Sequence, residues 1–127
     1  DAFAQEKCVV IFPSGRLARK VEGRMEEKDW FPTVVGLARK QGAPVVPLNL
    51  EARNSALYYL FCDLSNELRD ITLFHELLNK RASKIRMTFG GMIHPDLLQG
   101  EPAAVTEKLK QHVSYALLKD PDAAFRP

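Results

Sequence analysis

Short apolar runs alternate with longer amphipathic stretches along this chain. The run Cys8–Phe12 predicts a buried strand, which Pro13 ends because proline has no backbone N–H to donate. The run Pro44–Leu50 predicts a second strand. Apolar and polar residues alternate within Ser83–Ile93, which predicts a third strand with one exposed face.

Four stretches have helical spacing. The first follows Asp29, a favourable N-cap, and stops at Gly42. The second is strongly apolar and starts at Asn54 or Ser55, and the third covers Ile71–Asn79. A last amphipathic helix is predicted from Pro102 to Leu118, with these residues on one face: Val105, Leu109, Val113 and Leu117. Residues 15–28 mix both charge signs with two glycines and predict a loop.

Helices that alternate with short apolar strands favour a layered α/β domain, with a mainly parallel sheet flanked by helices. We expect residues 1–119 to form part of a single domain and residues 120–127 to be a frayed tail. In such sheets, ligands bind outside the carboxyl ends of the strands. The residues that directly follow each predicted strand are therefore the first candidates for a site.

Ser14, Gly15 and Arg16 follow the first predicted strand. Ser-Gly favours a tight turn with backbone N–H groups, and a guanidinium binds phosphate or carboxylate oxygens bidentately. These residues predict an anion site. Arg16 could instead pair with Glu22 or Glu26 on the surface, and Ser14 could donate to an anion or merely close the turn.

Arg53 and Asn54 follow the second predicted strand and can line the same site. The alternative is that Asn54 or Ser55 caps the next helix. The cations of the charged loop could also gather anionic lipid, but its interspersed glutamates favour a solvated loop; these cations are Arg19, Lys20 and Arg24.

The apolar helix that begins near Asn54 has two interpretations. Its large side chains could form an acyl groove or a membrane-facing patch, but an ordinary buried helix is the favoured reading; they are Leu57, Tyr58, Leu60 and Phe61. His75 is expected to be a core or boundary histidine and not a base.

The composition is that of an ordinary soluble globular protein, with 46% hydrophobic and 27% charged residues. A net charge of +2 gives no reason to expect a nucleic-acid partner. Cys8 and Cys62 lie in apolar runs, which predicts reduced core thiols, and their spacing fits no zinc site. No apolar stretch reaches the length of a membrane span.

The run Ile11-Phe12-Pro13-Ser14-Gly15-Arg16, followed after a loop and a helix by Val45-Val46-Pro47-Leu48, resembles a known pair of motifs. They are the third and fourth sequence blocks of the glycerolphosphate and lysophospholipid acyltransferase family. Residues 53–60 and 76–81 are similar to its bacterial hemolysin-like branch, some members of which acylate lyso-ornithine lipids. The resemblance covers residues 5–95.

This resemblance implies transfer of an acyl group from acyl-CoA or acyl-carrier protein to the hydroxyl of a lysolipid, either a glycerolipid or an ornithine lipid. It implies no bound cofactor or metal. Ser14, Gly15 and Arg16 would bind the anionic head of the acceptor, Pro47 would shape the neighbouring strand, and Pro13 is a weaker candidate. The expected location is the cytoplasm, peripheral to the inner face of the cytoplasmic membrane, and self-association is a further expectation.

The chain departs from the family pattern in two ways. The third block of the family usually has Glu where this chain has Ser14. It also has a Thr between the glycine and the arginine, and this chain has no Thr between Gly15 and Arg16. The catalytic His-x4-Asp signature precedes the third block, and none of the three histidines here has an Asp at that spacing. We therefore expect this signature upstream of Asp1 in the parent polypeptide, no catalytic residue in this chain, and no activity of the chain alone. The alternative is a non-enzymatic lipid or acyl-chain binding module.

Overall fold

The computed structural model describes residues 5, 7–15, 19–21, 24–52, 54–80 and 84–127. The chain divides into two units. The first unit comprises Asp1–Leu17, Lys28–Asn49 and Thr88–Pro127, and the second comprises Ala18–Glu27 and Leu50–Met87. Each unit is described by itself.

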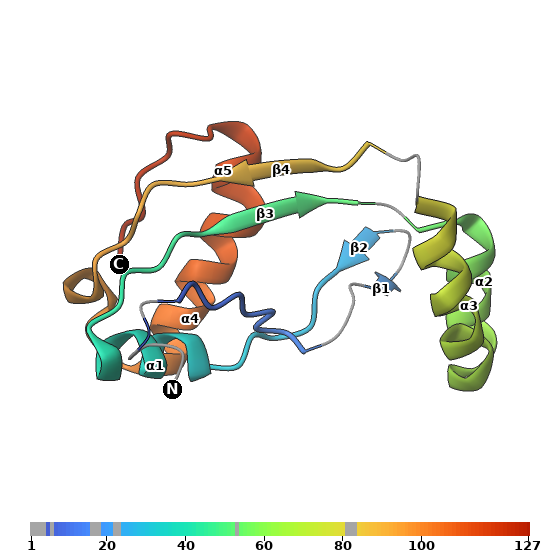
Figure 1. Cartoon of the computed structure of the whole chain (residues 1–127), viewed down its shortest axis with the longest axis horizontal. Coiled ribbons are helices and arrows are strands. Elements are labelled where there is room, and N and C mark those ends of the chain that lie inside the picture. Colours follow the sequence, from blue (N-terminus) through green and yellow to red (C-terminus); the bar gives the residue numbers. More distant parts are fainter. Residues whose placement is uncertain (1–4, 6, 16–18, 22–23, 53, 81–83) are drawn as a thin grey trace. The chain divides into compact units, whose positions relative to one another are not determined.

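The first unit contains helix α1 and all the helical segments that follow β4 (Figure 1). Its elements are helix α1 (Thr33–Gln41), the 3-10 turn η2 (Pro95–Leu98), helix α4 (Pro102–Gln111), the π-helical segment η3 (His112–Ala116) and helix α5 (Leu117–Lys119). The last three follow one another directly, so the predicted helix from Pro102 to Leu118 is confirmed. All four side chains predicted for its buried face are buried: Val105, Leu109, Val113 and Leu117.

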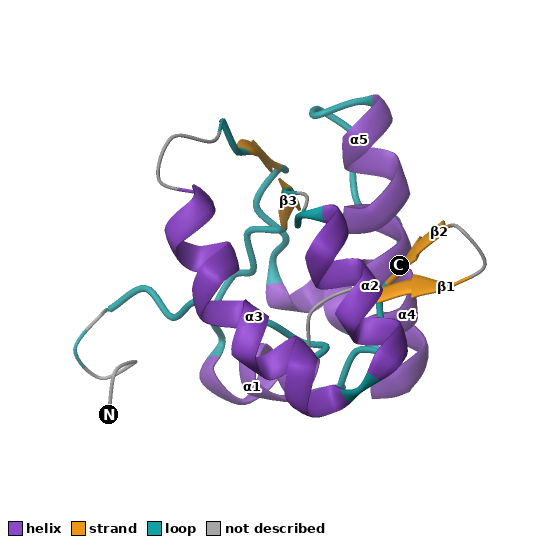
Figure 2. Ribbon diagram, turned by 90° about the vertical axis from the view of Figure 1, so that its right-hand side faces the viewer, coloured by secondary structure: helices purple, strands orange, loops and turns teal. Residues whose placement is uncertain are grey.

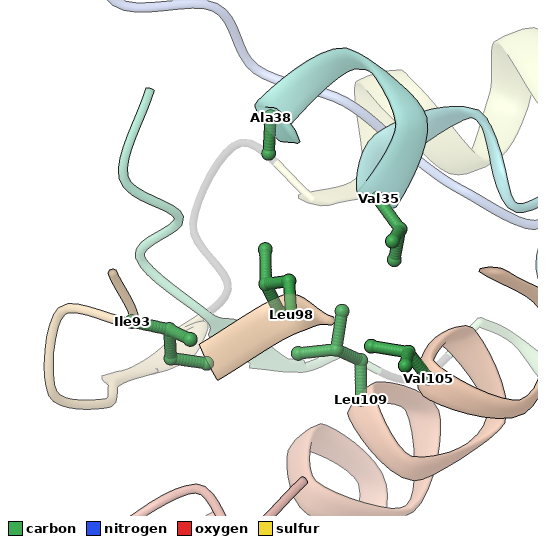
Figure 3. Close-up of a cluster of buried hydrophobic side chains, with 6 residues drawn as sticks. All are labelled: Val35, Ala38, Ile93, Leu98, Val105 and Leu109. Carbon is green, nitrogen blue, oxygen red and sulfur yellow. The ribbon is translucent and has the colours of Figure 1, made fainter. Parts of the chain in front are cut away.

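The core of the first unit forms where α1, η2 and α4 meet around Leu98 (Figure 3). Its buried members are Val35, Ala38, Ile93, Leu98, Val105 and Leu109. Three half-buried side chains pack against this cluster, namely Trp30, Val45 and Phe125. Phe125 belongs to the tail at residues 120–127, and its ring also meets that of His112 edge-on, with 5.5 Å between the ring centroids.

Helix α1 starts later than the sequence predicts. Pro32 is the N-cap, and Asp29 instead accepts a hydrogen bond from Lys110 at 3.3 Å. Proline lacks the N–H that a helix interior needs, so it stands at the boundary. The predicted end at Gly42 is confirmed: this residue has φ 59°, and its N–H donates to the carbonyls of Ala38 and Arg39.

Within the described residues, the strands pair as two ribbons of two strands each. Strand β3 (Leu48–Glu51) pairs with β4 (Arg86–Phe89), and the arrows of Figure 1 run in opposite directions. An antiparallel bridge joins Val45 to Ile93. Strands β1 (Arg19–Val21) and β2 (Arg24–Glu26) form an antiparallel hairpin in the second unit. The alternation of helices and strands fits an α/β fold, but the mainly parallel sheet is not found among the described residues.

The prediction of a first strand at Cys8–Phe12 is wrong. These residues are irregular and exposed, and they include the free thiol of Cys8, for which burial was predicted. An apolar run forms a strand only where another strand accepts its hydrogen bonds, and among the described residues β3 and β4 pair with each other. The loop predicted at residues 15–28 instead contains the β1–β2 hairpin.

Two helices dominate the second unit (Figure 2). Helix α2 (Ala56–Leu64) and helix α3 (Asn66–Asn79) pack against each other, and Ser65 alone separates them. Both helices were predicted, although α3 begins before Ile71. The Ser65 side chain accepts a hydrogen bond from the N–H of Leu68 at 3.2 Å, and this cap explains the earlier start.

Gly90 fills the closest packing position beside the β3–β4 ribbon. Its N–H donates to the carbonyl of Pro47 at 2.9 Å. A Cβ atom at this position would lie 2.9 Å from Cγ of Pro47 and 2.8 Å from Cδ2 of Leu117. Both distances are below normal van der Waals contact, so only glycine fits. Gly91, next in the chain, has open space at the same place.

We therefore predict that Gly90→Ala lowers the free energy of unfolding by about 1–3 kcal/mol, because the added methyl group must push the proline ring and Leu117 apart. Urea denaturation followed by circular dichroism measures this. Gly91→Ala is the matched control and should leave the stability equal or slightly higher. Equal midpoints for Gly90→Ala and the parent chain would contradict the packing.

Candidate functional site

The candidate anion site begins with a turn at residues 12–15. The N–H of Gly15 donates to the carbonyl of Phe12 at 3.0 Å, and the N–H of Phe31 donates to the carbonyl of Pro13 at 3.0 Å. Gly15 has φ 60°, a conformation that favours glycine. The turn that was predicted from Ser-Gly is therefore present. Its Gly15 N–H is already used within the turn, so an anion would need other donors.

Ser14 is buried within this turn, with 5% of its surface exposed. A headgroup can reach so buried a hydroxyl only if the turn opens. Of the two roles considered for Ser14, donation to an anion and closure of the turn, burial therefore favours closure of the turn. Arg16 and Arg53 lie outside the described residues, as do the side chains of the three loop cations. Binding of an acceptor by Ser14, Gly15 and Arg16 stays a prediction.

Pro47 is buried in the first unit, where its carbonyl and ring contact Gly90. This contact fixes the backbone just before β3, which is compatible with the predicted role in shaping that strand. The next residues of the ribbon are tied to the last helix, because Asn49 donates through Nδ2 to the carbonyl of Val113 at 2.9 Å. Val113 lies in the π-helical segment, and a π-helix is a place where carbonyl partners shift.

Asn54 and Ser55 belong to a polar cluster in the second unit. Ser55 caps α2, and its Oγ accepts from the N–H of Tyr58 at 3.2 Å. The same hydroxyl donates to Oε1 of Glu76 at 2.5 Å, and the Ser55 N–H donates to Oε2 of Glu76 at 2.8 Å. The sequence allowed either Asn54 or Ser55 as the cap of this helix, and in the structure the cap is Ser55.

Lys80 completes this cluster. Its Nζ donates to Oε2 of Glu76 at 3.1 Å and to Oδ1 of Asn54 at 2.5 Å. The N–H of Asn54 donates in turn to the hydroxyl of Tyr59 at 3.2 Å. Asn54 is thereby held by two partners in its own unit. Sequence reasoning missed Glu76 and Lys80 as partners of this segment. The spacing of four residues indicates that Glu76 and Lys80 pair, but nothing local points to Ser55.

The carboxylate of Glu76 stays charged in spite of its burial. Burial by itself raises the pKa of Glu76, but hydrogen bonds from the hydroxyl and N–H of Ser55 and the charge and hydrogen bond of Lys80 together outweigh it, so the net pKa is lowered. A carboxylate with a lowered pKa is a weak proton acceptor, and its oxygens are occupied. The cluster therefore acts as a clamp between the start of α2 and the end of α3, and not as a general base.

The three histidines lie in different settings. The His75 side chain is 64% exposed, so its predicted core or boundary position is wrong. His94 is exposed, with Nδ1 2.9 Å from Oδ2 of Asp96. His112 is buried, and this burial lowers its pKa. Within the described residues there is no group of three or more side chains suited to bind a metal ion.

We predict that the clamp makes the stability of the chain sensitive to acid. The pKa of Glu76 is lower in the folded state than the ordinary value of 4.5, so its contribution is complete above that pH and is lost as the pH falls through the folded pKa. Glu76→Gln should therefore lower the free energy of unfolding near neutral pH by about 1–3 kcal/mol and flatten its decline below pH 4.5.

Urea denaturation at a series of pH values, followed by circular dichroism, measures both effects. Glu67→Gln is the control on the same helix: Glu67 is exposed, and its bond from the Ser65 hydroxyl at 2.8 Å can also be accepted by a glutamine oxygen. Identical pH profiles for Glu76→Gln and the parent chain would rule out the clamp as the source of acid sensitivity.

Comparisons with known proteins give one relevant similarity. No family model matches the chain, and no solved structure matches it. A lyso-glycine lipid O-acyltransferase of Phocaeicola vulgatus is 28% identical over 94 residues, which cover 69% of this chain and 34% of that protein. The chain thus spans about a third of the length of this relative. The similarity supports a relationship to the lysolipid acyltransferases and no closer assignment.

Proposed function

We propose that this chain is part of an O-acyltransferase that moves an acyl group from an acyl thioester to the hydroxyl of a lysolipid. The observation that carries the proposal is the similarity to the lyso-glycine lipid O-acyltransferase. The two motifs at residues 11–16 and 45–48 agree with it, because both resemble sequence blocks of the lysophospholipid acyltransferase family. The acyl thioester would be acyl-CoA or acyl-carrier protein, and the acceptor would carry an anionic head.

In the proposed reaction the acceptor hydroxyl attacks the thioester carbonyl. A C–O bond forms, the C–S bond breaks, and the hydroxyl proton passes through a base to the departing thiolate. The 127 residues lack the His-x4-Asp signature of the family, and Glu76 is engaged in the clamp, so we assign the base to another segment of the polypeptide. The proposed contribution of the chain is therefore to bind and orient the acceptor.

The binding role is assigned to the turn at residues 12–15 and to Arg16. The turn fixes the backbone directly before Arg16 through the hydrogen bonds of Gly15 and Phe31. A fixed backbone reduces the entropy lost when a guanidinium orders on a phosphate or carboxylate. The acceptor contacts would come chiefly from the Arg16 guanidinium, since Ser14 is buried and the Gly15 N–H is occupied.

The reaction is tested with radiolabelled acyl-CoA or acyl-carrier protein and a lysolipid acceptor. We predict no transfer by the 127-residue chain alone and transfer by the full polypeptide of its gene. The reason is that a general base contributes about a hundredfold or more to such a step. Turnover by the chain alone would contradict the assignment of the base to another segment. Lysolipid binding without transfer by the full polypeptide would favour the non-enzymatic lipid-binding module.

The role of Arg16 is tested by substitution in the full polypeptide. We predict that Arg16→Ala raises the KM for the acceptor roughly tenfold to a hundredfold, because a charge-assisted bidentate contact contributes about 1.5–3 kcal/mol. Arg16→Lys should restore only part of this, since an ammonium group lacks the planar fork of donors. Steady-state kinetics with varied acceptor measure the effect.

Arg126→Ala is the matched control for this experiment, because Arg126 is an exposed arginine in the C-terminal tail. It should leave the KM for the acceptor unchanged. If Arg16 instead formed a surface ion pair, Arg16→Ala would cost at most about 1 kcal/mol of stability and leave the kinetics unaltered. Unchanged acceptor kinetics would therefore refute the anion-binding role.

A further inference from the structure

The helices of the second unit expose rows of large apolar side chains. On α2 these are Leu57, Leu60 and Leu64, and on α3 they are Leu68, Ile71 and Leu78. Their spacings of three, four and seven residues place each row on one face of its helix. Leu64 is 63% exposed, Ile71 70% and Leu78 76%. The favoured sequence reading of an ordinary buried helix is therefore wrong for the leucines of α2.

Among the described side chains of the same helix pair, those that are buried are polar. The side chains of α2 and α3 that the structure describes as buried are Tyr58, Thr72 and Glu76, and each carries a polar atom. Glu76 is held by the clamp with Ser55 and Lys80. A helix that only stabilises a domain turns its apolar residues inward. Exposed apolar rows on both helices of a pair indicate a surface that meets an apolar partner.

The sequence that follows the helix pair is basic. Between Glu76 and Asp96 the chain has no acidic residue, and it has four cations: Lys80, Arg81, Lys84 and Arg86. Lys80 is engaged in the clamp with Glu76, whereas Lys84 and Arg86 are exposed, and Arg86 also lies 3.4 Å from the carboxylate of Glu51. The same unit exposes the apolar side chains of Ile85 and Met87 between these cations. Apolar and cationic side chains thus alternate along the segment that leads into β4.

We propose that the α2–α3 pair and the basic segment after it form a docking surface for an anionic phospholipid bilayer. Exposed leucines and isoleucines insert among the acyl chains near the headgroups, and neighbouring cations are attracted to anionic lipid, each making binding about fivefold tighter. Neither helix is long and apolar enough to span a bilayer, which holds for all helices of the described residues. The pair would therefore lie on the surface. This inference goes beyond the proposed acyl transfer and does not rest on it.

A lipid bilayer fits these observations better than a second copy of the chain. A self-complementary contact would place each basic segment against the same surface of a second copy. The carboxylates described as exposed there are Glu51, which already lies near Arg86, and Glu67. An anionic bilayer supplies both an apolar layer and the opposite charge. Self-association remains an outcome that the experiment distinguishes.

The test is co-sedimentation of the 127-residue chain with vesicles of phosphatidylcholine alone or mixed with an equal part of phosphatidylglycerol. We expect binding to the mixed vesicles that weakens at high salt. Leu60→Gln combined with Leu64→Gln should lower the partition coefficient about tenfold or more, because the variant no longer transfers the apolar surface of two leucines from water into the bilayer. Glutamine is a good helix former, so α2 should persist, as circular dichroism checks.

Two controls make the result specific. Leu97→Gln combined with Leu118→Gln removes two leucines of the first unit that are also about half exposed, and it should bind as the parent chain does. Lys84→Gln should weaken binding to the anionic vesicles about fivefold and leave binding to neutral vesicles unchanged.

Three results would overturn the proposal: no binding of the parent chain to either vesicle, equal binding of the α2 double variant, or equal losses in the two leucine pairs. Analytical ultracentrifugation without vesicles covers the remaining case. A dimer that the α2 substitutions abolish would assign this surface to a second copy of the chain. Loss of acyl transfer in the full polypeptide, with vesicle binding intact, would refute the proposed function and leave the docking surface standing.

Discussion

Side-chain packing around Leu98 is the interaction on which the first unit depends. Leu98 is fully buried at the end of a short 3-10 turn, a position with little intrinsic stability of its own. Helix α1 packs against both this turn and α4, and the Arg39 guanidinium donates to the carbonyl of Leu98. The turn is thereby held by apolar contact on its side chain and by a cation on its backbone. These contacts also set where Ile93, and with it the strand bridge to Val45, can lie.

The second unit is organised by a different force. Its buried carboxylate, Glu76, is offset by three donors from Ser55 and Lys80, so the charge is kept in the folded state at little net cost. The clamp fixes the start of α2 against the end of α3 through polar contacts. The unit can therefore present leucines outward without losing the contact that joins its helices. The polar clamp thus joins the two helices, and their exposed leucines form the proposed bilayer surface.

The candidate site was only partly predictable. Residue types and spacing alone identified the turn at Ser14 and Gly15, and the left-handed conformation of Gly15 agrees with that reading. The sequence could not indicate that the Ser14 side chain is buried or that the Gly15 N–H is used by Phe12, since both depend on how the turn packs and closes. The clamp could not be read either, because Ser55 and Glu76 lie 21 residues apart and meet only when α2 folds back on α3.

The helices were determined by the sequence, because helical hydrogen bonds and caps join residues three or four positions apart. The buried face of the helix that starts at Pro102 and the end of α1 at Gly42 follow from such local rules. Strand pairing and burial were decided by the tertiary structure, because a strand needs a partner that is distant in the chain. The apolar run Cys8–Phe12 has no such partner among the described residues and lies exposed, while β3 and β4 pair as an antiparallel ribbon. The local sequence pattern thus determined which segments form helices. Long-range contacts determined which segments pair as strands and which side chains are buried.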